Sequence, residues 1–182
     1  MDKKLANKKQ TRLLWVDLEM TGLDPLKDRI IEIAAIVTDW DFNELAVHEM
    51  VIHQPARVMG KMDEWNTTQH GKSGLTERVK ASDISEKLAE KEMIALIEAH
   101  FPKNTPVILA GNSIHMDRRF IISRMPKLDS YLHYRMLDVS AWKIVFEGKF
   151  GRKFSKPENH RALDDIRGSI EELKYYLGKL AK

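Results

Sequence analysis

The stretch "LLWVDLEM" (Leu13–Met20) places two acids, Asp17 and Glu19, inside an apolar run. The run is apolar at odd and even positions alike, which predicts a strand near the centre of a sheet, covered on both faces. Alternate side chains of a strand share a face, so the two acids lie on the same side as Leu13 and Trp15. The fold therefore needs layers on both sides of this strand, one of which contains two like charges.

Two partly buried carboxylates repel each other and resist ionising unless a cation joins them. Mg²⁺ and Mn²⁺ prefer oxygen ligands, so Asp17 and Glu19 predict a divalent metal site. The alternative is an edge strand with one face in water, where both acids would be ordinary solvated residues. Leu13 and Trp15 on the same face favour the metal site.

The first third of the chain predicts an antiparallel meander. The apolar strand is followed by β-rich segments over residues 29–40 and 44–54, and residues 41–43 form the turn between them. Sequential strands with short connections pair as neighbours, so we expect the three strands to lie side by side.

Later segments alternate between helical and strand patterns. The expected elements are a helix within 81–101 capped by Ser82 or Asp83, a strand over 106–111, a helix over 117–125, a strand over 135–140, and a helix through Trp142 and Phe146. The final helix carries an apolar stripe made of Leu163, Ile166, Ile170, Leu173, Leu177 and Leu180. Together these elements predict an α/β fold: a mixed five-stranded sheet flanked by helices.

Composition excludes several kinds of site. The 182 residues include no cysteine, which rules out disulfides, thiolate zinc sites, iron–sulfur clusters and cysteine nucleophiles. Hydrophobic residues make up 43% and charged residues 31%, as in an ordinary globular protein rather than a disordered one.

The positive charge is concentrated at the beginning of the chain. Residues 1–12 have a net charge of +4, so the other 170 residues sum to −1 within the total of +3. A nearly neutral body predicts few phosphate contacts, unless basic residues gather locally. The apolar run after the leader is too short for a signal peptide, and no stretch is long enough to span a bilayer. We expect a cytoplasmic protein with a flexible basic leader (1–12) and one domain (13–182).

Further acids and a histidine lie at the beginnings of two expected helices. Asp117 follows the buried strand that ends at residue 111, and His160, Asp164 and Asp165 precede or open the last helix. Each group has an ordinary explanation by itself. Acids complement the positive end of a helix, and Asn159 is a suitable cap.

The combination of these groups in this order resembles the His-containing branch of the DEDD exonuclease superfamily. The resemblance covers nearly the whole chain and rests on "VDLEMTGL", "GNSIHMDRRF" and "HRALDDI". Within that branch, "DLEMTGLDP", "MDEWN" with "SGL" after it, and "HYRMLDVS" resemble the oligoribonuclease family.

The resemblance implies a ribonuclease-H-like fold and phosphodiester hydrolysis with two divalent ions, Mg²⁺ or Mn²⁺. By motif position, Asp17, Glu19, Asp117 and Asp165 would bind the metals, and His160 would be the general base. The implied reaction removes mononucleotides from the 3′ end of short RNAs, down to dinucleotides.

The resemblance also implies contacts with the substrate. Leu23 would wedge between bases, Trp65 and His70 would line the nucleotide site, Ser113, Ser140 and Lys143 would lie near the sugar or phosphate of the 5′ nucleotide, and Tyr134 and Arg135 would come from the partner subunit of a homodimer. For three of these, other interpretations stay open: Leu23 and Trp65 as core residues, and Lys143 as an ordinary exposed lysine.

Two rival functions are weighed against this one. The first is a DNA or longer-RNA exonuclease of the same superfamily, which would use the same acids. The second is a non-catalytic nucleic-acid-binding relative, which the presence of all five catalytic positions disfavours.

Overall fold

A five-stranded mixed sheet lies at the centre of the computed structural model, which describes residues 11–155 and 161–180. The strand order is β3-β2-β1-β4-β5. The bounds are β1 Leu13–Met20, β2 Ile30–Thr38, β3 Glu44–Val51, β4 Val107–Gly111 and β5 Leu132–Asp138. Neighbours among β1, β2 and β3 pair antiparallel, and β4 is parallel to both β1 and β5. The expected meander and the expected mixed sheet are confirmed.

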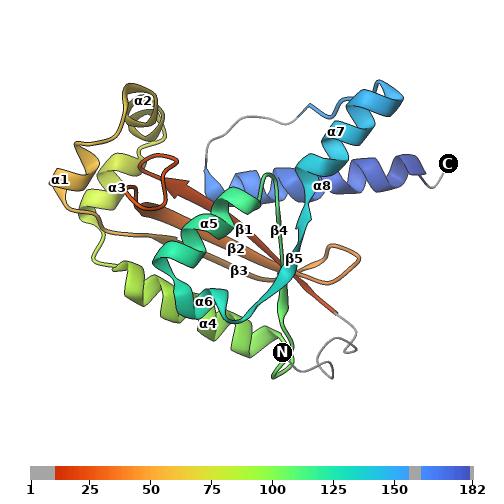
Figure 1. Cartoon of the computed structure of the whole chain (residues 1–182), viewed down its shortest axis with the longest axis horizontal. Helices are drawn as coiled ribbons and strands as arrows, with labels where there is room; N and C mark the ends of the chain where they lie inside the picture. Colours follow the sequence, from red (N-terminus) through yellow and green to blue (C-terminus); the bar gives the residue numbers. More distant parts are fainter. Residues whose placement is uncertain (1–10, 156–160, 181–182) are drawn as a thin grey trace.

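Helices cover both faces of this sheet (Figure 1). Their bounds are α1 Ala56–Met59, α2 Glu64–Lys72, α3 Leu75–Ala81, α4 Glu86–His100, α5 His115–Arg124, α6 Pro126–Asp129, α7 Val139–Phe150 and α8 Ala162–Leu180. Helices α4, α5 and α6 lie together on one face, α8 crosses the other, and α1 to α3 gather near the end of β1. None of the helices in the described part of the chain has the length and apolar character needed to cross a membrane.

Strand β1 contributes to two separate hydrophobic clusters, one on each face. Leu14, Val16 and Leu18 belong to the cluster that includes residues of α4 and α5, whereas Leu13 and Trp15 pack with residues of α8. Both Leu13 and Trp15 are fully buried. Burying a large apolar side chain stabilises the fold by about 1.5–3 kcal/mol, so α8 is held firmly over this face. The alternative of a wet edge strand is therefore wrong.

The segment between β3 and α4 differs from the expectation, because it contains three helices that the sequence did not reveal. Helix α2, "EWNTTQHGK", has no apolar stripe, and α1 has only four residues. Helix α2 begins at a local cap instead, since the Asp63 side chain accepts a hydrogen bond from the Asn66 N–H at 2.7 Å. A local cap can begin a helix that lacks amphipathic spacing.

The cap of α4 is Ser85, so the expected caps Ser82 and Asp83 were wrong. The Ser85 hydroxyl accepts from the Leu88 N–H, while the Ser82 hydroxyl donates to the Val51 carbonyl at 2.6 Å. The long-range bond to β3 keeps Ser82 in the preceding loop.

The apolar stripe of α8 is confirmed in its middle and wrong at its end. Ile166, Ile170 and Leu173 are buried, but Leu177 and Leu180 are exposed. Tyr176 is buried instead, because Phe146 of α7 packs against its ring with 4.7 Å between centroids.

Candidate metal and active site

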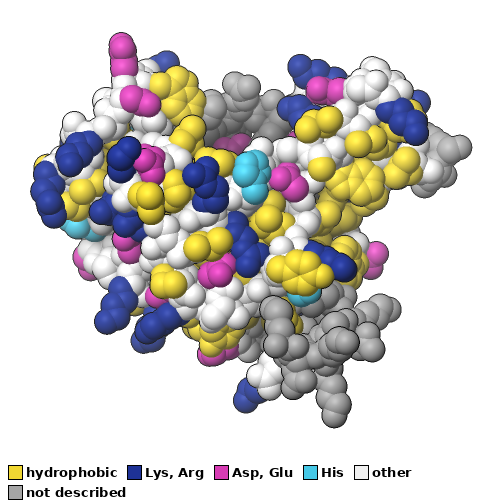
Figure 2. Space-filling model, viewed as in Figure 1, with side chains coloured by type: hydrophobic (Ala, Val, Ile, Leu, Met, Phe, Trp, Pro, Cys, Tyr) yellow, Lys and Arg dark blue, Asp and Glu magenta, His cyan; other side chains and the backbone are white. Residues whose placement is uncertain are grey.

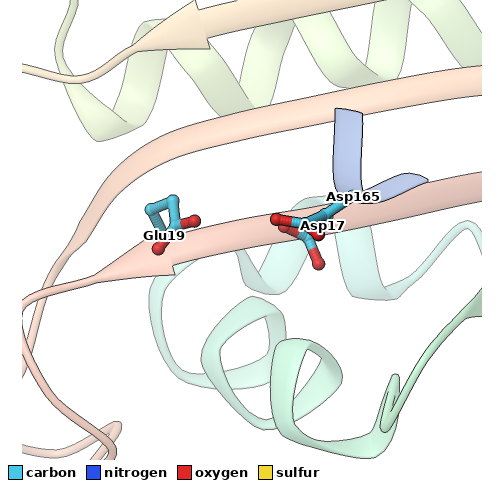
Figure 3. A group of neighbouring side chains, drawn as sticks. All are labelled: Asp17, Glu19 and Asp165. Carbon is cyan, nitrogen blue, oxygen red and sulfur yellow. The ribbon is translucent and has the colours of Figure 1, made fainter. Parts of the chain in front are cut away.

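Three carboxylates meet where β1 passes beneath the beginning of α8 (Figure 3). Asp17 and Glu19 lie on the same face of β1, opposite Ala34 and Glu32 of β2. Asp165 comes from the first turn of α8. One oxygen of each acid lies within 4.8 Å of the others, and all three side chains are half-buried.

The packing of α8 selects Asp165 over its neighbour. Ala162 and Ile166 are buried against the sheet, so Asp165 is directed toward β1, while Asp164 is exposed to solvent. This agrees with the interpretation from the motif spacing. The first turn of a helix also carries partial positive charge, which stabilises a carboxylate there.

Asp117 approaches β1 from α5, on which it lies in the first turn. Its side chain is buried, and Oδ1 accepts a hydrogen bond from the backbone N–H of Leu18 at 3.0 Å. Asp117 is not one of the three acids within 4.8 Å of one another, but it is bonded to the residue between Asp17 and Glu19. Burial raises the pKa of Asp117, although the bond from Leu18 partly opposes that rise.

The site has an excess of negative charge. Burial, followed by the nearby carboxylates of Glu32, Asp165 and Asp117 in that order, raises the pKa of Glu19 to about 8. A divalent cation removes this conflict, because it favours the ionised form of every acid that it contacts. The donors are carboxylate oxygens, which suit Mg²⁺ and Mn²⁺. The residues present therefore fit a divalent metal ion.

His70 of α2 is fixed beside Glu19. Its Nε2 donates to the Met20 carbonyl at 2.9 Å, and its Nδ1 lies 3.9 Å from Glu19 Oε2. The side chain is buried, so His70 connects α2 to the end of β1. The expected general base, His160, lies outside the residues that the structure describes.

Comparisons with known proteins agree with this geometry. Residues 14–173 match the RNase_T family, described as Exonuclease. A Pseudomonas paraeruginosa protein named Oligoribonuclease is 52% identical over 168 residues, covering 90% of this chain and 93% of the relative. This chain belongs to the oligoribonuclease family. Other relatives of that name come from Nitrosomonas europaea (50% identity, 90% of this chain, 92% of the relative) and Neisseria meningitidis (46%, 92% and 91%). As a family member, the chain is a nuclease.

Solved structures confirm the ribonuclease-H-like exonuclease fold. The zinc-bound Escherichia coli exonuclease I complex with single-stranded DNA superimposes with a TM-score of 0.68 at 18% identity, covering 91% of this chain and 40% of that one. Exonuclease I of Methylocaldum szegediense gives a TM-score of 0.67 at 16% identity, covering 88% and 39%. This chain thus spans about 40% of the length of these exonuclease I chains.

Two of the expected substrate contacts lie in solvent. Leu23, just after β1, is 69% exposed, and Trp65, on α2, is 61% exposed. The interpretation of these two residues as core is therefore wrong. Folding leaves both apolar side chains open to water.

Ser113 and Ser140 are brought together at the carboxyl ends of β4 and β5. Their hydroxyls lie 3.1 Å apart, and the Ser113 N–H donates both to Ser140 Oγ at 2.9 Å and to Asp138 Oδ1 at 3.0 Å. Lys143 lies one turn further along α7 and is half-buried. The two serines therefore form one polar group, and Lys143 follows Ser140 on the same helix.

Tyr134 and Arg135 lie on β5, which is an edge strand of the sheet. Tyr134 is 64% exposed, and the Arg135 guanidinium carbon lies 5.3 Å from the centre of its ring. The ring of His133, the residue before Tyr134, stacks with the Tyr134 ring, with 4.5 Å between the two centroids. The aromatic ring and the cation are therefore presented together on the outside of the molecule.

One buried acid near the site was missed by the sequence analysis. Glu32 is fully buried opposite Glu19, and its Oε1 lies 2.8 Å from Arg78 Nη2 of α3. Its Oε2 accepts from the Ala162 N–H at the beginning of α8. The available signal was a lone acid in an apolar strand, the same signal that singled out Asp17 and Glu19.

Proposed function

We propose that this chain is a 3′-to-5′ exoribonuclease that degrades short oligoribonucleotides, down to dinucleotides, to mononucleotides. The observation that carries the proposal is the set of carboxylates on β1, α5 and α8, in a chain about half identical to proteins named Oligoribonuclease. The acids present an oxygen-lined site, and the family relation supplies the substrate class.

The metals are proposed to be two Mg²⁺ or Mn²⁺ ions held by Asp17, Glu19, Asp117 and Asp165. When bound, such ions lower the pKa of an attacking water and stabilise negative charge on the attacking and leaving oxygens. The protein contributes by holding the acids in place before substrate arrives. The Leu18–Asp117 hydrogen bond fixes α5 to β1, and the packing of α8 on Trp15 fixes Asp165.

His160 is proposed to accept the proton of the attacking water. This assignment rests on the family motif, in which the histidine precedes the last metal-binding acid by five residues, as His160 precedes Asp165. An unperturbed imidazole has a pKa of roughly 6.5, so it can accept a proton near neutral pH.

The substrate is proposed to bind among residues around this site. Leu23 separates the bases, and Trp65 and His70 line the nucleotide site. The group of Ser113, Ser140 and Lys143 would contact the sugar or phosphate of the 5′ nucleotide. The hydrogen bonding between Ser113 and Ser140 supports this part of the proposal, because it holds the two hydroxyls together.

A homodimer is proposed to complete the substrate site, with the partner's Tyr134 and the partner's Arg135 closing its far end. Exposure of the Tyr134 ring on an edge strand supports this, and guanidinium suits a terminal phosphate. We also propose that the protein, with its basic leader at 1–12 and one domain at 13–182, works in the cytoplasm. If light scattering shows a monomer and kinetics show that this monomer is fully active, the dimer proposal is wrong.

The direct test compares RNA of two to twenty nucleotides with DNA of the same lengths. The proposal expects release of mononucleotides from the 3′ end, fastest per molecule on the shortest RNAs, and loss of activity in chelator. Faster hydrolysis of DNA or of twenty-nucleotide RNA would favour the rival exonuclease. Absence of metal-dependent hydrolysis on every substrate would favour the non-catalytic relative.

A further inference from the structure

A hydrogen-bonded network joins the Ser113–Ser140 pair to helix α8. Its centre is Asn112, the first residue after β4. The Asn112 Nδ2 donates to Ser169 Oγ at 2.9 Å and to Glu172 Oε2 at 3.0 Å, and both of these residues belong to α8. The Asn112 Oδ1 accepts a hydrogen bond from the Ser140 hydroxyl at 3.2 Å. A single side chain thus connects α8 to the two serines.

The partners of Asn112 leave one orientation for its amide. Burial, followed by the hydrogen bond to Glu172, raises the pKa of Tyr176, so the Tyr176 hydroxyl keeps its proton and donates to Glu172 Oε1 at 2.8 Å. The Ser169 hydroxyl donates to a carbonyl of its own helix at 2.8 Å. Glu172 and Ser169 therefore both offer Asn112 an acceptor, which requires Nδ2 to face them. The amide oxygen then faces Ser140.

The α8 side of the network is buried and reaches the candidate metal site. Ser169 and Glu172 are both buried. Buried polar groups are nearly always hydrogen-bonded, because an unpaired one costs free energy. The carbonyl that accepts from the Ser169 hydroxyl is that of Asp165, the residue that brings the third carboxylate to the site. Asn112 is therefore fixed relative to the helix that carries Asp165.

The backbone before Asn112 lies against the strand that carries the other two acids of the cluster. Strand β4 pairs in parallel with β1. A Cβ at Gly111 would lie 2.9 Å from the Val16 carbonyl oxygen, so this close approach of the two strands requires glycine. Val16 is followed directly by Asp17. The network is thus attached both to β1 and to α8, the two elements from which the clustered carboxylates come.

Ser113 is held in a backbone conformation that a serine rarely adopts. Its φ is +48°, in the left-handed region. Its N–H lies between two acceptors, Asp138 Oδ1 at 3.0 Å and Ser140 Oγ at 2.9 Å. The same Asp138 oxygen accepts from the Ser140 N–H at 2.9 Å, where α7 begins. Such conformations persist only where surrounding contacts determine them, and they cluster at functional sites. The place of Ser113 therefore depends on Ser140, which in turn is bonded to Asn112.

Net charge does not define where a short substrate would lie. Figure 2 shows Lys and Arg side chains scattered among acidic and hydrophobic ones on one face of the molecule. Residues 13–182 together have a net charge of −1. Binding through charge needs many basic contacts to phosphates, and a dinucleotide has few phosphates. Its position must therefore be set by individually placed polar groups.

We propose that Asn112 is a positioning residue for the 5′ nucleotide of the substrate, because it sets the Ser113–Ser140 pair relative to α8. The inference rests on the proposed function, which places that nucleotide at the two serines. Asn112 acts through the Ser140 hydroxyl, and Glu172 orients the Asn112 amide. Contacts to the 5′ nucleotide lie away from the bond that is broken, so they stabilise the ground state and the transition state alike. Loss of such contacts raises KM and leaves kcat nearly unchanged.

The first test is Asn112→Ala, which removes the contacts to Ser140 and to α8 together. The kcat and KM are measured with a diribonucleotide in Mg²⁺. We expect KM to rise about tenfold, as for the loss of one net hydrogen bond, and kcat to fall less than about threefold. A merely structural role would lower the melting temperature and the active fraction, so kcat would fall while KM stayed unchanged. That result, or failure of the variant to fold, would overturn the proposal.

The second test exchanges the amide and the carboxylate. Asn112→Asp alone places two carboxylates at the 3.0 Å contact with Glu172 and should raise KM about tenfold or more. Adding Glu172→Gln supplies an amide that can donate to the new carboxylate, while the glutamine oxygen accepts from the Tyr176 hydroxyl. The Ser169 hydroxyl can rotate to donate to the new carboxylate, which still accepts from Ser140. We expect this exchanged pair to have a KM within about twofold of the original.

The matched control is Asn43→Asp, in the turn between β2 and β3. The Asn43 Nδ2 donates to Asp39 Oδ2 at 2.9 Å, so this change also brings two carboxylates together, but in an exposed turn. We expect its kcat and KM to equal those of the original protein. If Asn112→Asp has the KM of the control, or if the exchanged pair is no better than a folded Asn112→Asp, the proposal is wrong. If Asn112→Asp does not fold, a raised KM in the exchanged pair overturns the proposal.

Binding separates this proposal from the proposed function. Labelled diribonucleotide is titrated, with Ca²⁺ in place of Mg²⁺, against the original protein and Asn112→Ala. If the original binds the dinucleotide without hydrolysing it in Mg²⁺ or Mn²⁺, and Asn112→Ala binds about tenfold more weakly, the function fails and the positioning role stands. If the original hydrolyses the dinucleotide, and Asn112→Ala changes neither KM nor the dissociation constant, the positioning role fails and the function stands. An original protein that neither binds nor hydrolyses the dinucleotide overturns both.

Discussion

The backbone N–H of Leu18 donates a hydrogen bond to Asp117 Oδ1 at 3.0 Å, across 99 positions of the sequence. Leu18 stands between Asp17 and Glu19 on β1, so this bond places the buried acid of α5 against the strand that carries the other two. The bond also satisfies a buried backbone donor, which would cost about 1–3 kcal/mol if left without a partner. The same contact is thus part of the fold and part of the site.

Asp117→Asn separates these two roles. Asparagine retains an oxygen that can accept from Leu18, but it loses the negative charge, so we expect a melting temperature close to that of the original protein and hydrolysis reduced about a hundredfold or more. Asp117→Ala should lose the same activity and also about 1–3 kcal/mol of unfolding free energy, because the Leu18 N–H has no acceptor. Diribonucleotide hydrolysis and urea denaturation measure the two effects. Undiminished hydrolysis by either variant would remove Asp117 from the site.

The stability of the metal-free protein should depend on pH through Glu19. The pKa of Glu19 is raised from 4.5 to about 8 in the folded protein. Between these values the folded state holds a proton that the unfolded chain has released, so the unfolding free energy falls as pH rises. From about pH 6 to about pH 8.5, the fall should be about 2 kcal/mol.

Mg²⁺ should abolish most of this fall, because it replaces the proton as the partner of the carboxylates. Urea denaturation at a series of pH values, in chelator and in Mg²⁺, checks the prediction. A metal-free protein that becomes more stable toward alkaline pH would contradict the assignment of an overcharged site, and so would identical curves with and without Mg²⁺.

Arg78→Gln should destabilise the protein more than Arg167→Gln does. Arg78 is the cationic partner of the fully buried Glu32, at 2.8 Å, whereas Arg167 pairs with Glu44 at the surface, at 3.0 Å. Removing the first partner leaves a buried charge uncompensated. Because Arg78 is itself partly exposed, we expect a loss of about 1–3 kcal/mol rather than the larger cost of a wholly buried pair.

Loss of the surface pair should cost at most about 1 kcal/mol. Urea denaturation of both variants, in the same buffer, makes the comparison. Equal losses would mean that Glu32 is neutralised by something other than Arg78 in the folded protein.

The sequence predicted β1 correctly because its apolar residues occupy both faces and its acids share one. The bounds of Leu13–Met20 and the convergence of Asp17, Glu19 and Asp165 agree with the structure. Helix α2 could not be predicted in the same way, because "EWNTTQHGK" begins at the Asp63 cap and has no apolar stripe. Apolar residues at helical spacing indicate a helix that buries one face, and α2 buries only Asn66 and His70.

Other features depended on contacts between distant parts of the chain. Ser82, Asp83 and Ser85 are all suitable caps for α4, and the bond of Ser82 to the Val51 carbonyl decides among them. A surface pocket likewise joins residues of the β1–β2 turn to residues around α1, about thirty positions later in the sequence.

Replacing Asp165 and Asp164 by asparagine, one at a time, tests the central claim most directly. The two acids are adjacent in the first turn of α8, but only Asp165 lies with Asp17 and Glu19, while Asp164 is exposed. Hydrolysis of a diribonucleotide in Mg²⁺ or Mn²⁺ is the measurement. We predict a loss of about a hundredfold or more for Asp165→Asn and less than twofold for Asp164→Asn. Full activity of Asp165→Asn, or an equal loss in both variants, would contradict the account.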